Sequence, residues 1–182
     1  GKHSHKNGFT NNEHGIFNGA QQTMPKLLQK AGYQTALIGK WHLVSRPTGF
    51  DHWDILPAQG HYYNPDFYNA DSSYVVKGYL TNIITDKAIH WLDETRDKNK
   101  PFALFVHHKA CHRDWLPELK YLHEFEDKTF ELPANFYDDY AGRKAAGLTE
   151  MEFGKDRTLD YDCKMLSPYR GSHLKDAYLN MI

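Results

Sequence analysis

A short apolar strand followed directly by a lysine and a histidine is encoded by Gly32-Tyr33-Gln34-Thr35-Ala36-Leu37-Ile38-Gly39-Lys40-Trp41-His42. Residues 34–38 predict a buried β-strand, and Gly39 allows the backbone to approach a ligand closely just past it. In open α/β sheets, ligands bind in a crevice outside the carboxyl ends of the strands. Lys40 and His42 are therefore candidates for a site that binds an oxyanion.

A helix followed by a strand occurs twice in the chain. Residues 24–31 predict an amphipathic helix that Thr23 caps and Gly32 ends, just before the strand described above. Residues 82–96 predict a second helix, and 102–106 form an apolar run without alternation, typical of a parallel strand covered on both faces. The apolar helix faces comprise Met24, Leu27, Leu28 and Ala31 in the first helix and Ile84, Ala88, Trp91 and Leu92 in the second. Two such units predict a layered α/β sheet.

The rest of the chain is less regular. Residues 48–78 are rich in Asp, Asn, Gly, Pro and Tyr, with strand-like pieces at 53–56 and 74–76, and are interpreted as an active-site insertion. Residues 118–126 predict one more helix, and 145–182 form a tail without an assignment. Length and composition fit a single domain, of which residues 1–182 are interpreted as a part.

Composition argues against several classes of protein. The 182 residues include 22 Lys and Arg against 23 Asp and Glu, so the basic excess of a nucleic-acid binder is absent. No apolar run approaches the roughly 20 residues of a membrane-spanning helix. Cys111 and Cys163 are too few and too far apart for a disulfide framework. The chain opens on a cationic run at 1–8 without an initiator methionine or signal peptide, so we expect a piece of a longer protein.

A second group of candidates directly follows the strand predicted at 102–106. It comprises His107, His108, Lys109 and His112. Because the carboxyl ends of parallel strands meet at one edge of a sheet, this group and the Lys40–His42 pair are expected to face one crevice. Cations and imidazoles converging there can neutralise a tetrahedral oxyanion and protonate a departing alcohol. These are the demands of sulfate or phosphate ester cleavage, although the set holds no nucleophile.

Both groups resemble signatures of the sulfatase family. Residues 32–42 resemble its second signature. Residues 101–115 are similar to a family segment in which a strand is followed by Pro-His, with Cys111 standing here in place of that proline. The resemblance implies an alkaline-phosphatase-like α/β fold, in which this chain is the central part of a large domain with a mixed sheet flanked by helices.

The same resemblance implies roles for individual residues. Lys40 is expected to bind sulfate, and His42 to act on the nucleophile. His112 is expected to be the general acid that protonates the leaving oxygen. Lys109 is expected to be a second contact to the sulfate or the substrate.

The start of the chain bears on the nucleophile. Residues 1–8 are similar to the family segment that follows a Cys-or-Ser-x-Pro-x-Arg motif, which this chain lacks. In sulfatases that Cys or Ser becomes formylglycine, whose hydrated aldehyde attacks sulfur beside a calcium held by acidic residues near both ends of the protein. The resemblance covers most of residues 1–145. It implies a middle fragment that is inactive without the missing N- and C-terminal parts, from a periplasmic or secreted enzyme.

Within the family, the residues after the second strand and those at 135–140 look most like bacterial N-acetylglucosamine-6-sulfatases. This resemblance implies a sulfated carbohydrate substrate, such as 6-O-sulfated N-acetylglucosamine in glycosaminoglycan or mucin glycans. Arg113 and Trp115 are then expected to grip the sugar, because a guanidinium offers forked donors and an indole offers a flat apolar face. His108 is expected to reach the substrate, whereas His107 is expected to be buried and hydrogen-bonded in the strand.

Two other functions fit the same residues. A phosphoester or phosphonate hydrolase of the alkaline-phosphatase superfamily would share the sheet and the crevice and differ in nucleophile and metals. A non-catalytic carbohydrate-binding piece would account for the 14% aromatic residues, but it gives no reason for the Lys40–His42 pair. A zinc site is a further hypothesis, suggested by His108, Cys111 and His112. These residues lack the second pair of ligands that structural zinc sites have, so no metal ligand is assigned to this chain.

Overall fold

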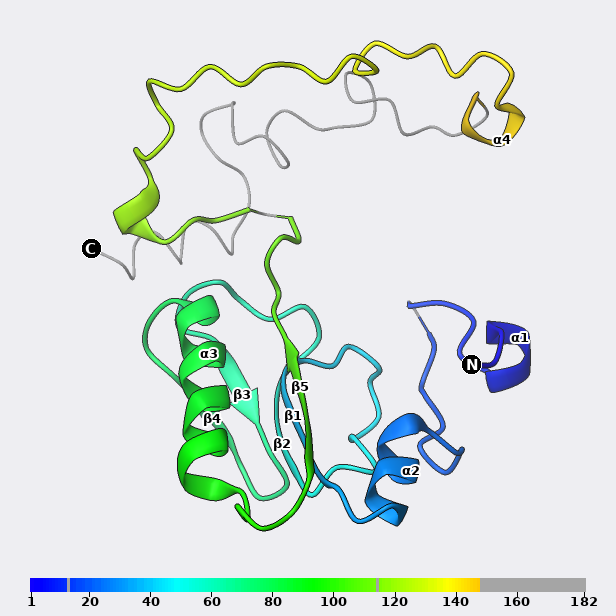
Figure 1. Ribbon diagram of the computed structural model, residues 1–182, viewed down its shortest axis with the longest axis vertical. Coiled ribbons are helices and arrows are strands. Elements are labelled where there is room, and N and C mark those ends of the chain that lie inside the picture. The colour runs from blue at the N-terminus through cyan, green and yellow to red at the C-terminus, as the bar shows by residue number, and fades with distance from the viewer. Residues whose placement is uncertain (13, 114, 148–182) are drawn as a thin grey trace. The chain divides into compact units, whose positions relative to one another are not determined.

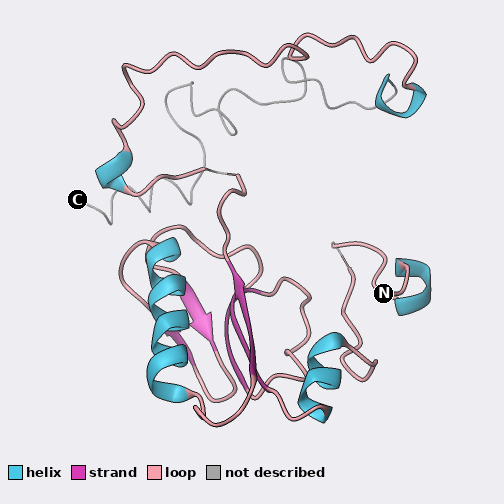
Figure 2. Ribbon diagram, in the orientation of Figure 1, coloured by secondary structure: helices cyan, strands magenta, loops and turns pink. Residues whose placement is uncertain are grey.

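The computed structural model describes residues 1–12, 14–113 and 115–147. The chain divides into two compact units, Gly1–His112 and a second that begins at Arg113, and each is described by itself. Helices, strands and loops of both units are distinguished in Figure 2. No helix of the described residues is long and apolar enough to cross a lipid bilayer.

The first unit is built on a five-stranded mixed sheet with the strand order β4-β3-β2-β1-β5. Its strands are β1 (Gln34–Lys40), β2 (His52–Leu56), β3 (Asp66–Tyr68), β4 (Ser73–Val75) and β5 (Phe102–His107). β1 pairs in parallel with β2 and with β5, whereas β3 pairs antiparallel with β2 and β4. The predicted α/β sheet is confirmed, and both predicted strands lie within β1 and β5.

Gly39 lets the ends of β1 and β5 lie close together. It pairs with His107, and its φ of 107° lies in the region that favours glycine. A Cβ atom at this position would lie 2.1 Å from the His107 carbonyl oxygen. Since no L side chain fits this gap, the glycine is needed where the two parallel strands end side by side.

One face of the sheet is covered by α3 (Leu80–His90), which continues through a π-helical turn at Trp91–Thr95 (Figure 1). The buried core between helix and sheet consists of Ala36, Ile38, Leu56, Phe67, Leu80, Ile83, Ile84, Ala88 and Trp91. The predicted helix at 82–96 is confirmed with an earlier start, and its predicted apolar face lies in this core. Side chains alternate along a strand, so the fully buried Leu37 points to the opposite face.

On that side of the sheet lies α2 (Met24–Lys30), which confirms the helix predicted at 24–31 (Figure 1). Gly32 follows its end with a φ of 87°, as a helix stop requires. Met24 is 59% exposed and Leu27 is 46% exposed. Leu28 is half-buried, so the predicted apolar face is only partly covered within the described residues.

The predicted side-chain cap of α2 is wrong. Thr23 has the extended backbone of an N-cap residue, but its hydroxyl makes no capping hydrogen bond. An N-cap oxygen normally accepts from the second or third helical N–H, and Pro25 at the second position has none. The first turn is held instead by Leu27, whose N–H donates to the Thr23 carbonyl at 3.2 Å.

Residues 48–78 supply three strands of the sheet. The strand-like pieces predicted at 53–56 and 74–76 correspond to β2 and β4, while the sequence does not predict β3. Residues 57–65 connect β2 to β3 and are called the β2–β3 loop. Residues 48–78 are therefore part of the sheet, and they also supply side chains at its carboxyl edge.

β5 is the last strand in the order on its side of the sheet. Phe102 and Val106, both on this strand, are exposed. Residues 103–105 are half-buried, and Leu104 packs against the core. Within the described residues, β5 is therefore covered only in part, and the predicted full covering of both faces is not found.

Short helical segments complete the described residues. α1 spans Ser4–Asn7 in the first unit, and α4 spans Lys144–Gly147 in the second. A 3-10 turn at Leu119–Tyr121 stands where the sequence predicts an α-helix over 118–126, so that prediction is wrong. A helix of this length is marginal unless tertiary packing covers an apolar face, and the apolar side chains here are exposed. Residues 148–182, with most of the predicted tail and Cys163, lie outside the described residues.

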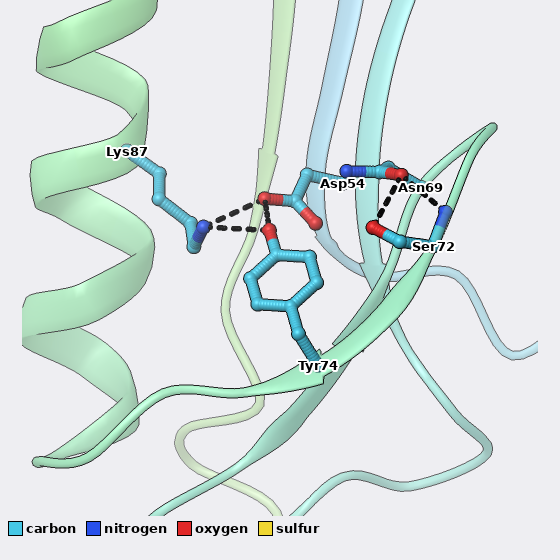
Figure 3. A network of polar contacts seen from close by, with 5 residues as sticks. All are labelled: Asp54, Asn69, Ser72, Tyr74 and Lys87. Carbon is cyan, nitrogen blue, oxygen red and sulfur yellow. Dashed lines mark hydrogen bonds and ion pairs between the residues drawn. The ribbon is translucent and has the colours of Figure 1, made fainter.

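A partly buried polar network joins β2, β4 and α3 (Figure 3). Asp54 Oδ2 accepts hydrogen bonds from Lys87 Nζ at 2.7 Å and from the Tyr74 hydroxyl at 2.5 Å. Lys87 also donates to the Tyr74 hydroxyl at 2.9 Å. Nearby, the Asn69 side chain accepts from the backbone and hydroxyl of Ser72 at 3.0 and 3.3 Å, which closes the turn between β3 and β4.

Candidate functional site

The carboxyl end of β1 positions the first two candidate residues. Lys40 is the last residue of the strand, and His42 follows with a left-handed φ of 54°. The Trp41 indole between them donates to the Ser45 carbonyl at 2.7 Å and holds the turn. The left-handed residue changes the direction of the chain, so that the side chains of Lys40 and His42 reach the same polar partner.

That partner is Gln59 of the β2–β3 loop. Its Oε1 accepts a hydrogen bond from Lys40 Nζ at 2.5 Å, and its Nε2 lies 3.5 Å from His42 Nε2. No pattern in the sequence selects this residue, because a single glutamine in a polar segment belongs to no motif. The signal that finds it is strand register, since Leu56, just before the loop, pairs with Lys40.

Lys109 and His112 lie in one turn after β5. The His112 N–H donates to the Lys109 carbonyl at 2.9 Å, and the Ala110–Cys111 peptide bond is cis. Lys109 is 7% exposed, and its Nζ lies 5.1 Å from the centroid of the Tyr62 ring. The Tyr62 hydroxyl donates to the His112 carbonyl at 2.6 Å. Tyr62, a second residue that sequence reasoning does not select, therefore contacts both candidates.

The charges of both groups act on His42. Burial lowers the pKa of His42 below its ordinary value, and the nearby charges of Lys40, His112 and Lys109 lower it further. Burial also lowers the pKa of Lys40. Four of the predicted site residues thus share one electrostatic environment at the carboxyl ends of β1 and β5. A neutral imidazole beside ammonium groups can accept a proton, while the ammonium groups can bind an anion.

The other predicted residues differ in placement. His107 ends β5, and its Nδ1 lies 3.1 Å from the Lys40 carbonyl oxygen, so it is hydrogen-bonded as predicted. It is exposed rather than buried, so that part of the prediction is wrong. His108 is exposed at the first position after the strand. Arg113 and Trp115 are exposed residues of the second unit, and their contact with a substrate stays a prediction.

The donor set suits an anion better than a metal ion. In the described part of the chain, no group of three or more His, Cys, Asp or Glu side chains is arranged to hold a metal. The zinc site raised by His108, Cys111 and His112 is not formed there. The site instead combines two lysines, two histidines and a neutral amide.

Comparison by sequence finds one family and several relatives. The family model described as Sulfatase matches residues 1–182. The N-acetylglucosamine-6-O-sulfatase of Bacteroides thetaiotaomicron is 56% identical over 181 residues, which cover 97% of this chain and 32% of that protein. The uncharacterized sulfatase YdeN of Escherichia coli is 26% identical over 148 residues, which cover 64% of this chain and 26% of that protein.

Comparison with solved structures agrees with the comparison by sequence. The structure of BT4656 in complex with its substrate D-glucosamine-2-N,6-O-disulfate matches with a TM-score of 0.82 and 54% sequence identity. The match covers 97% of this chain and 36% of that one. The chain therefore spans about a third of the length of the first relatives that it matches.

Proposed function

We propose, since this chain belongs to the sulfatase family, that the protein of which it forms part hydrolyses sulfate esters of a carbohydrate. The predicted family and the alkaline-phosphatase-like fold are confirmed. The observation that carries the proposal is the convergence of two lysines and two histidines where β1 and β5 end. Lys40, Lys109 and His112 all act electrostatically on His42 there.

Lys40 and Lys109 are proposed to hold the sulfate group. A sulfate ester carries negative charge on its terminal oxygens, and more develops on the bridging oxygen as the S–O bond breaks. Ammonium groups held in a site of low dielectric stabilise this charge better than exposed ones do. The near-complete burial of Lys109 and the partial burial of Lys40 support this role.

His42 and His112 are proposed to transfer protons. The lowered pKa keeps His42 neutral at neutral pH, so its imidazole is able to accept a proton from an attacking oxygen. His112 donates a proton to the sugar oxygen as the S–O bond breaks, so that the sugar departs as an alcohol. The hydrogen bond from Tyr62 to the His112 carbonyl supports this role, because it fixes the backbone while the imidazole stays exposed.

The nucleophile and the metal are proposed to come from other parts of the complete protein. In the family, formylglycine supplies the attacking oxygen beside calcium. The sequence holds no Cys-or-Ser-x-Pro-x-Arg motif, and the described residues hold no set of metal ligands. This chain's own contribution is therefore anion binding and proton transfer. We expect the motif in the reading frame just before Gly1, where sequencing tests for it.

The proposed substrate carries a 6-O-sulfate on N-acetylglucosamine. The Bacteroides relative is named for that activity, and the matched structure holds D-glucosamine-2-N,6-O-disulfate. Arg113, Trp115 and His108 are proposed to contact the sugar through forked donors, an indole face and an imidazole. Sulfated glycans lie outside the cytoplasm, so a periplasmic or secreted location is proposed.

The test replaces Lys40 and His112 by alanine in the complete protein and measures sulfate release from N-acetylglucosamine-6-sulfate. Each variant is expected to lower kcat/KM by about a hundredfold or more while the melting temperature is unchanged. Lys77→Ala is the matched control, since it removes an exposed lysine between β4 and α3, and it is expected to retain full activity. Unchanged turnover in a site variant would remove that residue's assignment.

The corresponding sugar phosphate separates this proposal from its alternatives. Faster hydrolysis of the phosphate ester than of the sulfate ester would replace the sulfatase proposal with a phosphoester hydrolase. Binding of the sulfated sugar without hydrolysis, lost in Trp115→Ala but not in Lys40→Ala, would support a carbohydrate-binding protein.

A further inference from the structure

Two side chains of the β2–β3 loop contact the two halves of the proposed site. Gln59 lies between Lys40 and His42, and Tyr62 contacts Lys109 and His112. We infer that this loop is a positioning element, which sets the two lysines and the two histidines at fixed distances from one another. The inference rests on the proposed function, and it assigns Gln59 and Tyr62 roles that act through the four residues they contact.

A neutral amide suits the position of Gln59. Its oxygen accepts from the Lys40 ammonium at 2.5 Å, while its nitrogen lies 3.5 Å from the ring of a histidine whose neutral form is favoured. The amide can therefore orient both side chains without adding charge. A carboxylate here would favour the charged imidazole and would compete with sulfate for the lysine.

Tyr62 is held in place by its own contacts and in turn contacts Lys109 and His112. It is 4% exposed, its ring stacks on Tyr79 with centroids 6.2 Å apart, and its carbonyl accepts from the Leu80 N–H at 2.8 Å. These contacts tie it to the start of α3. The ring then holds the Lys109 ammonium by a cation–π contact, and the hydroxyl holds the backbone of His112.

The β2–β3 loop is tightly folded on both sides of Gln59. Ala58 has a left-handed φ of 44° and Gly60 a φ of 66°. A Cβ atom on Gly60 would lie 2.7 Å from Leu56 Cδ1, so the loop turns directly over the end of β2. Because Gln59 and Tyr62 share this turn, a shift of one is expected to shift the other, which couples the Lys40 side of the site to the Lys109 side.

Two conservative variants of the complete protein test the inference. Gln59→Glu keeps the size of the side chain and places a carboxylate beside His42. The charged groups that already face His42 are Lys40, Lys109 and His112. The acid limb of the kcat/KM profile is expected to move upward by about one pH unit. Tyr62→Phe keeps the ring beside Lys109 and removes the hydrogen bond to His112. It is expected to lower kcat about tenfold and to change KM less than about twofold.

Gln22→Glu and Tyr68→Phe are the matched controls, the first at an exposed position and the second on β3, and both are expected to keep wild-type kinetics. Wild-type kinetics and pH profiles in both loop variants, together with loss of sulfate release in Lys40→Ala, would overturn the positioning role alone. Full activity in Lys40→Ala would overturn the proposed function itself. Equal losses in Tyr62→Phe and Tyr68→Phe would indicate general destabilisation and would also overturn the positioning role.

Discussion

The carboxylate of Asp54, in the strand β2, accepts a hydrogen bond at 2.7 Å from Lys87 of α3, the helix that covers this face of the sheet. Burial tends to lower the pKa of Lys87, but the hydrogen bonds and charges of Asp54 and Tyr74 outweigh it and raise this pKa. The lysine therefore stays charged, and the ion pair joins the helix to the strand whose end begins the β2–β3 loop.

Lys87→Met is expected to lower the free energy of unfolding by about 2 kcal/mol, because it leaves the Asp54 carboxylate buried without its cation. Urea unfolding of the protein measures this loss. Lys77→Met, at an exposed position nearby, is expected to change it by less than about 0.5 kcal/mol. Adding Asp54→Asn to Lys87→Met is expected to restore part of the loss. A double variant less stable than Lys87→Met would contradict the ion-pair explanation.

Gly39→Ala is expected to abolish activity and to destabilise the protein by about 3 kcal/mol or more, because strain adds to a steric conflict between two strands. Gly78→Ala separates these effects. Gly78 has a similar φ of 126°, but its Cβ would meet its nearest neighbour, Ile83 Cδ1, at 3.7 Å. Its cost is expected to be about 1 kcal/mol, with activity retained. Thermal unfolding and sulfate release measure both, and equal effects would argue against the close approach of β1 and β5.

The pH dependence of kcat/KM is expected to follow the protonation of the His42 imidazole. Its pKa is lowered, so the imidazole remains neutral and able to accept a proton as the pH falls to about 6.5, the ordinary value for histidine. The rate is expected to fall only below that value. Lys109→Met removes one of the charges that lower this pKa, so its acid limb is expected to lie at higher pH than that of the wild type. An acid limb that stays in place in the variant would show that another group controls it.

Thr23→Val is expected to change the free energy of unfolding by less than about 0.5 kcal/mol, whereas loss of a working N-cap typically costs about 1 kcal/mol. The reason is that the Thr23 hydroxyl is buried and has no hydrogen-bond partner among the described residues. Urea unfolding distinguishes the two outcomes. A loss near the larger value would mean that the hydroxyl caps α2 in solution.

The sequence predicts those parts of the fold that a local apolar pattern or a general rule of parallel sheets determines. The helix around Ile84 and Ala88 and the apolar strand that ends at His107 are both visible as periodic or continuous apolar patterns. The adjacency of Lys40 and Lys109 follows from the rule that parallel strands end at the same edge. Four of the predicted site residues can therefore be grouped from the order of the residues alone.

The missed features depend on contacts between distant segments. Gln59 and Tyr62 acquire their places from the register of β2 against β1 and from the packing of Tyr62 on Tyr79, which no local pattern encodes. The apolar residues after Glu118 show helical spacing, but the side chains are exposed there and only a 3-10 turn forms. Local periodicity misleads when tertiary packing does not reward it.

The hydrogen bond between His107 and the Lys40 carbonyl joins residues 67 positions apart in the sequence. The strands β2, β3 and β4 and the helix α3 lie between these two residues in the sequence. β1 and β5 can therefore pair only when this long stretch of chain closes into a loop. Pairings of such long range form late, because the entropy of closing the loop is lost before the contacts are gained. During synthesis on the ribosome, Lys40 and His42 emerge long before Lys109 and His112 exist. Affinity of the proposed site for a sulfated ligand is therefore expected to arise only after β1 and β5 have paired, and it would serve as a marker of that long-range pairing.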